Sequence, residues 1–364
     1  HDQDEALSMS DRIVVMSDFP DRHRQDRAMP SNVEIGHRDD LDQMQRSLRE
    51  TPGCSVLIYE QTCAAEKRRR RKRGTMVDPP KRQFIAKSVC EGCGDCSEMS
   101  TCVSLMPVET AFGTKREIDQ SSCNKDYSCA NGFCPSFITV HGAEPRRAAR
   151  AGLDAGVLGD LPEPARAPIA GGSFNVMIAG IGGTGVVTVG GGVGIAAHIE
   201  GLGMSSFDMT RGSPKNGAEF SHLKIAQEPA ALTTAPIASG TADLLLAFDM
   251  VAGLAVESKR SLSIARTRIV VNSDVVPTAA FQFDRDLDMR PQSLLERLRG
   301  HALPGGVIDI DAKQLSGQLL GDSIGANMMM VGIALQSGLL PVGLAAIEEA
   351  IRLNGVAVAF NLEA

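Results

Sequence analysis

Seven of the nine cysteines lie between residues 90 and 134, and their spacing is typical of a region that binds iron–sulfur clusters. The first run is Cys90-x2-Cys93-x2-Cys96, and Cys134 is followed by proline. Three thiolates of one tight loop can bind three corners of a four-iron cluster, and in two-cluster ferredoxins the fourth thiolate comes from the other run. This rule predicts one [4Fe–4S] cluster on Cys90, Cys93, Cys96 and Cys134.

The other three cysteines of this region, Cys102, Cys123 and Cys129, are one ligand short of a second cluster. Asp126 lies between the last two and gives Cys-x2-Asp-x2-Cys, the same spacing with a carboxylate in the middle. Three interpretations stay open. Asp126 is the fourth ligand of a second, more labile cluster, it marks the place of an absent iron, or it is a solvated loop residue.

Disulfides and zinc are the alternatives for these cysteines. A disulfide framework needs an oxidising compartment and usually an even number of cysteines, whereas this sequence has nine and begins with a polar, acidic segment. Structural zinc uses paired Cys-x2-Cys knuckles, without a third cysteine at the same spacing. Cys54 and Cys63 lie outside the pattern, and we expect Cys54, which precedes an apolar strand, to be a buried core thiol.

A glycine loop follows an apolar strand at residues 175–179. It contains Gly180, Gly182 and Gly185, with Gly183 and Thr184 inside it. A strand, a tight turn and a helix N-terminus form a cradle of backbone N–H groups that binds anions. Asp208 follows Gly185 at about the distance of a ribose-binding acid, which favours NAD. The alternative is a turn whose glycines serve close packing and bind no nucleotide.

The run KRRRRKR at residues 67–73 is the densest charge in the chain. The whole chain carries a net charge of −7 and only 4% aromatic residues, so we expect no nucleic-acid partner. The run is therefore interpreted as a solvated segment or as a docking site for an acidic protein or a phosphate group. His37, His198 and His222 lack the partner spacing of a metal site or a catalytic triad, and no catalytic residue is assigned.

The elements that must position these residues have an α/β pattern. Residues 1–75 form about two βα units, residues 76–145 contain the cysteines, residues 146–172 form a linker rich in Pro, Gly, Ala and Arg, and residues 173–364 return to α/β alternation. The expected strands are residues 12–17, 55–59, 174–179, 243–248, 268–272 and 306–310. The expected helices are residues 39–49, 291–299 and 345–353.

Several of these motifs together resemble the fused indolepyruvate ferredoxin oxidoreductases. LIYEQTCAAEKRRRRKRG (57–74) is similar to the end of that family's thiamine-diphosphate domain. VCEGCGDC (89–96), DQSSCNKDYSC (119–129) and GFCP (132–135) are similar to its ferredoxin-like insert. IAGIGGTGVVT (178–188) resembles the glycine loop of the 2-oxoacid oxidoreductase gamma domain, and VVN (270–272), VVPT (275–278) and Asn327-Met328 follow in the expected order.

The resemblance implies the fold class and the reaction. It implies the C-terminal part of a thiamine-diphosphate-type α/β domain, a small ferredoxin-like insert and a Rossmann-like gamma domain. The reaction is the oxidative decarboxylation of an aryl 2-oxoacid with CoA, with electrons passing through [4Fe–4S] clusters to ferredoxin. Thiamine diphosphate stabilises the carbanion left by decarboxylation. An NAD(P)-dependent iron–sulfur reductase is the alternative, while the resemblance favours a gamma domain that completes the substrate or CoA surface.

The sequence departs from the family pattern at two places. It contains no Gly-Asp-Gly motif for magnesium and thiamine diphosphate, so we expect this motif in an upstream region of the same enzyme and no decarboxylase activity from this chain alone. Residues 211–217 have Pro214 and Asn216 where the family has a small-residue loop, although Lys215 and Gly217 match. We further expect a cytoplasmic protein with no membrane segment, which forms a homo-oligomer.

Overall fold

The computed structural model describes residues 10–102, 104–120, 122–142, 161–182, 185–210, 217–275 and 289–364. It divides into two compact units, His1–Asp78 and Pro79–Ala364. The expected boundary after residue 75 lies close to this division, whereas the expected cysteine region and C-terminal region share the second unit. Within the second unit we call residues 79–142 the cysteine lobe and residues 161–364 the sheet domain.

The first unit contains a three-stranded parallel sheet with the order β2-β1-β3. The central strand, β1 (Arg12–Ser17), is almost wholly buried because strands lie on both of its sides. Strands β1 and β3 (Ser55–Glu60) and helix α3 (Leu41–Arg49) lie where the sequence predicts them, whereas β2 (Val33–His37) was not predicted. The other helices are α2 (Pro20–Arg24), η1 (Arg38–Asp40) and α4 (Ala64–Lys72).

The cysteine lobe is built from two short antiparallel strand pairs, of which one is a hairpin. Strand β4 (Lys81–Ile85) pairs with β7 (Phe137–His141), and β5 (Leu105–Thr110) pairs with β6 (Gly113–Ile118). Helix α5 (Asp95–Ser100) and the short η2 (Ser128–Ala130) lie between the strands in sequence. The hydrophobic core described for the lobe is small and includes several of the cysteines themselves. We therefore expect bound inorganic ions to replace part of a hydrophobic core here.

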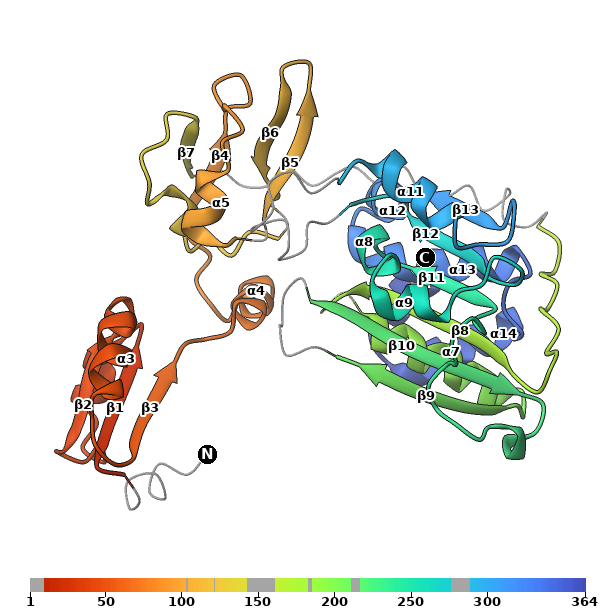
Figure 1. Ribbon diagram of the computed structural model, residues 1–364, viewed down its shortest axis with the longest axis horizontal. Helices are drawn as coiled ribbons and strands as arrows, with labels where there is room; N and C mark the ends of the chain where they lie inside the picture. Colours follow the sequence, from red (N-terminus) through yellow and green to blue (C-terminus); the bar gives the residue numbers. More distant parts are fainter. Residues whose placement is uncertain are drawn as a thin grey trace. The chain divides into compact units, whose positions relative to one another are not determined.

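The sheet domain contains a six-stranded mixed sheet with the order β13-β12-β11-β8-β10-β9 (Figure 1). The four predicted strands of this region are β8 (Phe174–Ile181), β11 (Leu244–Ala247), β12 (Arg268–Asn272) and β13 (Val307–Ile310), and they are parallel to one another. Two strands were not predicted. Strand β10 (Ala218–Ala226) runs antiparallel to both β8 and the edge strand β9 (Gly203–Met209). The α/β class is confirmed, and the sheet differs from an all-parallel dinucleotide-binding sheet at β10.

Helices cover both faces of this sheet. Helices α7 (Val186–Ile199), α13 (Ala326–Gln336) and α14 (Leu344–Asn354) pack against one face, and α8 (Met250–Gly253) and α11 (Pro291–Arg299) pack against the other. The other elements within the described residues of this domain are η3 (Pro229–Ala231), α9 (Val256–Ser261), α12 (Ala312–Leu320), η4 (Ser323–Gly325) and α15 (Val358–Glu363). None of the described helices combines the length and the apolar character that a membrane span needs.

The described part of the expected linker, residues 161–172, lies along the sheet domain. The amide of Ala167 donates to the carbonyl of Leu340 at 2.9 Å, and the side-chain amide of Gln336 donates to the carbonyl of Pro162 at 2.9 Å. These contacts fix this end of the linker against the turn that follows α13. Residues 146–160 of the linker lie outside the described residues.

Candidate iron–sulfur centre

Four cysteines surround one cavity of about 250 Å³ in the cysteine lobe. Three of them, Cys90, Cys93 and Cys96, come from one loop, and Cys134 comes from a distant part of the chain. These are the four residues that the spacing rule assigns to one cluster. Cys129 of the second run also lines this cavity.

Pairing of β4 with β7 brings Cys134 to the first loop. Ile85 lies opposite Phe137 at the end of this pairing, and the amide of Ala86 donates to the carbonyl of Ser136 at 2.8 Å. The chain on one side then continues into the loop that holds Cys90, while the chain on the other side comes from Cys134. The sulfur of Cys134 lies 3.0 Å from the hydroxyl oxygen of Ser136. Strand pairing therefore brings Cys134 next to the loop that holds the other three predicted ligands.

Two glycines let the first loop turn tightly around the cavity. Gly92 and Gly94 have φ angles of +77° and +83°, in the left-handed region that glycine tolerates. The amide of Gly92 donates to the sulfur of Cys90 at 3.4 Å, and a Cβ at Gly92 would lie 2.3 Å from the carbonyl oxygen of Thr114. A loop of this kind directs amide hydrogens toward sulfur, and such contacts stabilise cluster thiolates.

A buried arginine supplies positive charge to the cavity. Arg116 of β6 lines it and is only 3% exposed. Burial raises the pKa of the Cys96 thiol, and the positive charge of Arg116 acts in the opposite direction. Because a cluster with four thiolates carries negative charge, a buried guanidinium beside it lowers the cost of that charge. The sequence analysis did not assign Arg116 a role, although the alternating pattern of β6 places it on the same face as the buried Ile118.

The other predicted ligands also lie close together. Cys102 and Cys123 pack against the small core that contains the buried Cys129. Burial raises the pKa of Cys129 to about 12, with further contributions from Cys102 and Cys123, and burial also raises the pKa of Cys123. Asp126 is exposed, and its Oδ1 accepts hydrogen bonds from the amide and the hydroxyl of Ser128 at 3.2 and 3.0 Å.

The described residues contain no group of three His, Cys, Asp or Glu side chains that converges on a single metal ion. A four-iron cluster places a different demand on its ligands, because each thiolate binds its own iron and the ligands surround the cluster. Besides the four predicted ligands, Cys129, the buried Arg116 and the carboxylates of Glu91 and Asp95 line the cavity. Four thiolates around one cavity with a buried guanidinium beside them suit such a cluster. The residues present therefore fit a [4Fe–4S] cluster at Cys90, Cys93, Cys96 and Cys134.

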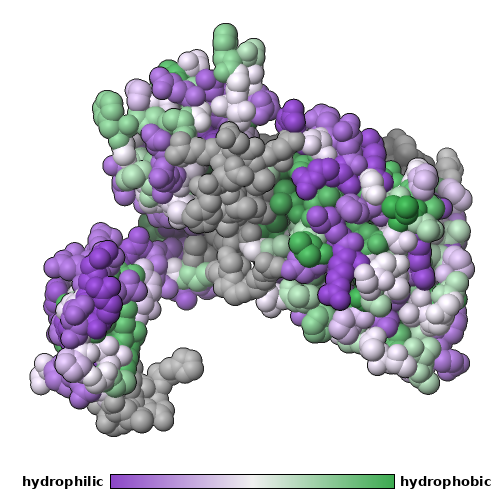
Figure 2. Space-filling view, viewed as in Figure 1, coloured by the Kyte–Doolittle hydropathy of each residue, from purple (hydrophilic) through white to green (hydrophobic). Residues whose placement is uncertain are grey.

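Exposed apolar side chains stand out from the cysteine lobe. Phe112, in the turn between β5 and β6, is 87% exposed, and Figure 2 shows apolar residues at the tip of this hairpin. Phe133, beside Cys134, is 100% exposed and lines the cavity together with Met99. The rim of the cavity is thus apolar on this side.

The glycine loop of the sheet domain is described in part. Gly180 lies near the end of β8, and the amide of Gly182 donates to the carbonyl of Gly217 at 2.8 Å. Gly185 has a φ of +101° and caps the N-terminus of α7. Gly183 and Thr184 lie outside the described residues, so the structure gives no geometry for the centre of the predicted cradle.

Asp208 does not take the place of a ribose-binding acid. It lies on the edge strand β9, and β10 separates that strand from β8 and its glycine loop. In a dinucleotide-binding fold the acid ends the strand next to the glycine-loop strand. The described geometry therefore gives the NAD interpretation no support. Of the segment that departs from the family pattern, residues 211–216 lie outside the described residues.

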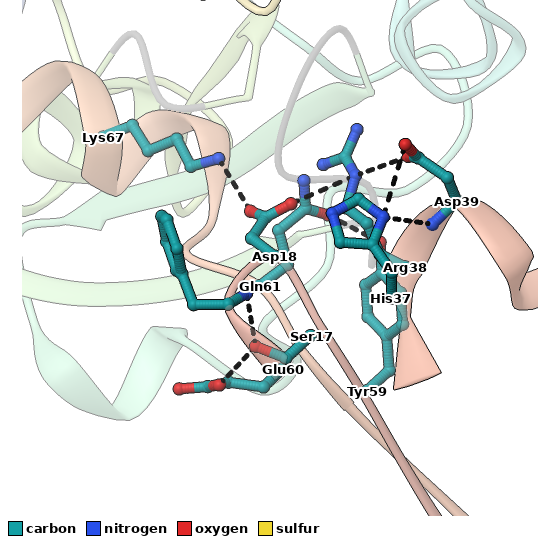
Figure 3. Close-up of polar contacts among 10 residues, drawn as sticks. Ser17, Asp18, His37, Arg38, Asp39, Tyr59, Glu60, Gln61 and Lys67 are labelled. Atoms are coloured by element: carbon teal, nitrogen blue, oxygen red, sulfur yellow. Dashed lines mark hydrogen bonds and ion pairs between the residues drawn. The ribbon is translucent and has the colours of Figure 1, made fainter. Parts of the chain in front are cut away.

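The basic run forms most of helix α4 in the first unit. Lys67 is held by Asp18, with 3.4 Å between Nζ and Oδ2, and the same carboxylate accepts from Arg38 at 3.1 Å (Figure 3). Glu66 pairs with Arg69 and Arg70 within the helix. Part of this charge is thus neutralised locally.

The expectation that Cys54 is a buried core thiol is wrong. Cys54 is exposed in the turn before β3, and its amide donates to the carboxylate of Asp11.

Comparison with known proteins identifies the family. Residues 175–364 match the family model for pyruvate ferredoxin/flavodoxin oxidoreductase, and the chain belongs to this family. The resemblance of the glycine loop and the motifs after it to a 2-oxoacid oxidoreductase gamma domain is thereby confirmed at the family level.

Individual relatives each cover about half of the chain. Over 196 residues, 52% of this chain and 91% of the relative, the sequence is 27% identical to indolepyruvate oxidoreductase subunit IorB of Archaeoglobus fulgidus. Pyruvate oxidoreductase subunit PORC of Thermotoga maritima is 17% identical with a TM-score of 0.37, covering 53% of this chain and 92% of PORC. The 2-oxoglutarate:ferredoxin oxidoreductase of Magnetococcus marinus is 19% identical with a TM-score of 0.37, covering 53% of this chain and 29% of that protein.

Proposed function

We propose that this chain is the electron-handling part of a 2-oxoacid:ferredoxin oxidoreductase that decarboxylates an aryl pyruvate oxidatively in the presence of CoA. Membership of the pyruvate ferredoxin/flavodoxin oxidoreductase family supports the reaction class. The match to an indolepyruvate oxidoreductase subunit supports an aryl substrate. The observation that carries the proposal is the meeting of Cys134 with Cys90, Cys93 and Cys96 around one cavity.

The residues of the cysteine lobe would hold the redox group and set its surroundings. The four cysteines bind its irons, and the buried Arg116 balances its negative charge. When bound, a [4Fe–4S] cluster accepts and releases single electrons. Cys93 is exposed, so this corner of the site lies at the protein surface, where ferredoxin can approach. Because cluster thiols must stay reduced, we place the protein in the cytoplasm.

Decarboxylation itself is assigned to thiamine diphosphate and magnesium held by another region of the enzyme. The printed sequence contains no Gly-Asp-Gly motif, while the first unit has the parallel βα pattern of the end of such a domain. In the sheet domain we assign the loop of Gly180, Gly182, Gly183, Thr184 and Gly185 to the surface for the substrate or CoA. Its position at the carboxyl end of β8, where α/β sheets bind ligands, supports this assignment.

The proposal is tested by following cluster reduction under strictly anaerobic conditions. The chain is mixed with a thiamine-diphosphate component from a fused enzyme of this family, and an aryl pyruvate with CoA is added. Visible absorption of the cluster should bleach, and it should not bleach when the thiamine-diphosphate component is left out. Bleaching by NADH alone would instead support an NAD(P)-dependent reductase.

Two variants make this test specific. Cys134→Ser removes the ligand that joins the two runs and should abolish substrate-driven bleaching. Cys54→Ser, which changes an exposed cysteine of the first unit, should bleach as the wild type does. Equal bleaching in both variants would contradict the assigned ligand set.

A further inference from the structure

The loop at residues 123–129, which we call the second loop, follows the same backbone course as the first loop at residues 90–96. Gly92 and Gly94 of the first loop correspond in position to Lys125 and Tyr127 of the second. All four residues have positive φ, with values of +77°, +83°, +56° and +64° in that order. Lysine and tyrosine adopt this conformation only at a cost. The second loop therefore has positive φ at the same two positions as the first loop, but it lacks the glycines that adopt such angles without strain.

The contacts of the two loops also correspond. The amide of Gly92 donates to the sulfur of Cys90 at 3.4 Å, and the amide of Lys125 donates to the sulfur of Cys123 at 3.4 Å. Each loop then enters a helical turn, α5 after the first loop and η2 after the second. The two loops thus share their amide–sulfur contacts as well as their positive φ angles.

The middle position of each loop is exposed. In the first loop this position is Cys93, and in the second loop it is Asp126. The flanking residues of the second loop, Cys123 and Cys129, are partly and fully buried, and Cys102 packs against the same small core. The second set of residues thus offers three thiolates and one exposed carboxylate, whereas the first set offers four thiolates.

We propose that Cys102, Cys123, Asp126 and Cys129 hold a second four-iron cluster from which the iron at Asp126 is released on oxidation, leaving a three-iron cluster. This inference rests on the proposed electron-handling function and adds to it a site that responds to iron and to oxidants. Soft thiolates are the preferred ligands of cluster iron, whereas a carboxylate suits harder ions. The iron at Asp126 is therefore the most weakly held.

Release of this iron is a one-electron oxidation of the cluster. A [4Fe–4S]²⁺ cluster gives [3Fe–4S]⁺, one Fe²⁺ ion and one electron. The leaving iron breaks its bonds to the carboxylate and to the cluster sulfides, and a one-electron oxidant, ferricyanide in the test, takes the electron. Reduction in the presence of Fe²⁺ reverses the conversion.

Asp126 can bind iron while it keeps its hydrogen bonds to Ser128. Its Oδ1 accepts from the amide and the hydroxyl of Ser128, and a carboxylate has a second oxygen for the metal. This arrangement also offers a control. An asparagine at this position keeps an oxygen that accepts from Ser128 but has no negative charge for iron, so Asp126→Asn preserves the turn and removes the ligand.

The test uses the full chain, purified without oxygen, and follows EPR spectra and iron content. Ferricyanide should produce the EPR signal of an oxidised three-iron cluster in the wild type, and dithionite with Fe²⁺ should then give the signal of a second reduced four-iron cluster. Asp126→Asn should contain the three-iron cluster without ferricyanide treatment and should gain no second four-iron signal from dithionite with Fe²⁺. Asp126→Cys, with four thiolates, should lose at least nine-tenths of the three-iron signal. Glu109→Gln, which changes an exposed carboxylate of β5 outside both loops, should behave as the wild type.

Two results would overturn the inference. One is equal iron content in the wild type and in Cys123→Ser, which would show that the second site holds no cluster. The other is the same oxidation response in the wild type and in Asp126→Cys. A reducible four-iron cluster that persists in Cys123→Ser, whose thiol does not line the first cavity, leaves the proposed function intact. Its absence there means that the proposed function has failed as well.

Discussion

The sheet domain and the cysteine lobe bury very different amounts of apolar surface. All eight residues of β8 are buried, and large hydrophobic clusters lie on both faces of its sheet. The described core of the cysteine lobe contains Ile85, Leu105, Ile118 and Cys129, with other cysteines packed against them. A small domain of this kind usually needs metal or disulfides for stability. The comparison indicates that side chains fold the sheet domain, whereas we expect the lobe to need bound clusters in order to fold.

Removal of iron should produce the largest difference in stability between the cysteine lobe and the sheet domain. We expect a chelator with a mild oxidant to speed amide hydrogen exchange in β4–β7 and β5–β6 at least a hundredfold, which corresponds to about 3 kcal/mol. Exchange in β8 and β11 should stay unchanged, because their core contains no predicted iron ligand. Hydrogen exchange read by mass spectrometry measures both regions in one sample. Unchanged exchange in the lobe would show that its fold does not depend on metal.

A methyl group at Gly92 should damage the lobe. It would lie 2.3 Å from a backbone oxygen of Thr114 at a residue with positive φ, so we expect Gly92→Ala to destabilise the lobe by about 2–4 kcal/mol and to lower its iron content. Gly132→Ala is the matched control, because the atom nearest to its added Cβ is Cγ of Met99 at 3.9 Å. Equal iron content in the two variants would contradict the close packing described for the first loop.

The corresponding test in the sheet domain uses two neighbouring glycines of α7. A Cβ at Gly190 would lie 2.4 Å from Oγ of Ser221, so Gly190→Ala should lower the free energy of unfolding by about 1–3 kcal/mol. A Cβ at Gly191 meets nothing within 4 Å, and Gly191→Ala should raise the free energy of unfolding by up to about 1 kcal/mol. Urea unfolding measures both. Neither variant should change the iron content, which is the sharpest contrast with Gly92→Ala.

The smallest effect concerns the charge of Arg116. Arg116→Gln removes a buried positive charge from the cavity, so the reduced, more negative cluster should become harder to form. We expect the midpoint potential to fall by about 60 mV, a tenfold change for one electron. Arg116→Lys keeps the charge and should restore most of the difference. A potentiometric titration followed by EPR makes the measurement, and an unchanged potential in Arg116→Gln would remove Arg116 from the electrostatics of the site.

Cysteine spacing grouped four residues that line one cavity, whereas the apolar pattern found four of the six strands described in the sheet domain. The grouping of Cys134 with the first loop could be inferred because the ligands of iron–sulfur clusters have a characteristic spacing in the sequence. Strands β9 and β10 were missed because serines, a histidine and charged residues interrupt their apolar pattern, and only pairing with β8 shows that they are strands. Burial of Arg116 could not be predicted either, since a charged residue in a short hairpin usually faces solvent.

The position of Asp208 shows the same limit for the glycine loop. Its distance from Gly185 in sequence matched a ribose-binding acid, yet the intervening antiparallel strand β10 places it on the sheet edge. Spacing along the chain supports the prediction of a site only when the order of the strands that hold its residues is known.

The most direct test of the account is the metal content and redox state of the anaerobically purified chain, compared with that of Cys134→Ser. We predict a brown protein with iron and acid-labile sulfide, whose dithionite-reduced form gives the EPR signal of a [4Fe–4S]⁺ cluster, and loss of that cluster in Cys134→Ser. A folded, colourless protein that contains zinc or no metal, or a Cys134→Ser variant with an unchanged spectrum, would contradict the account.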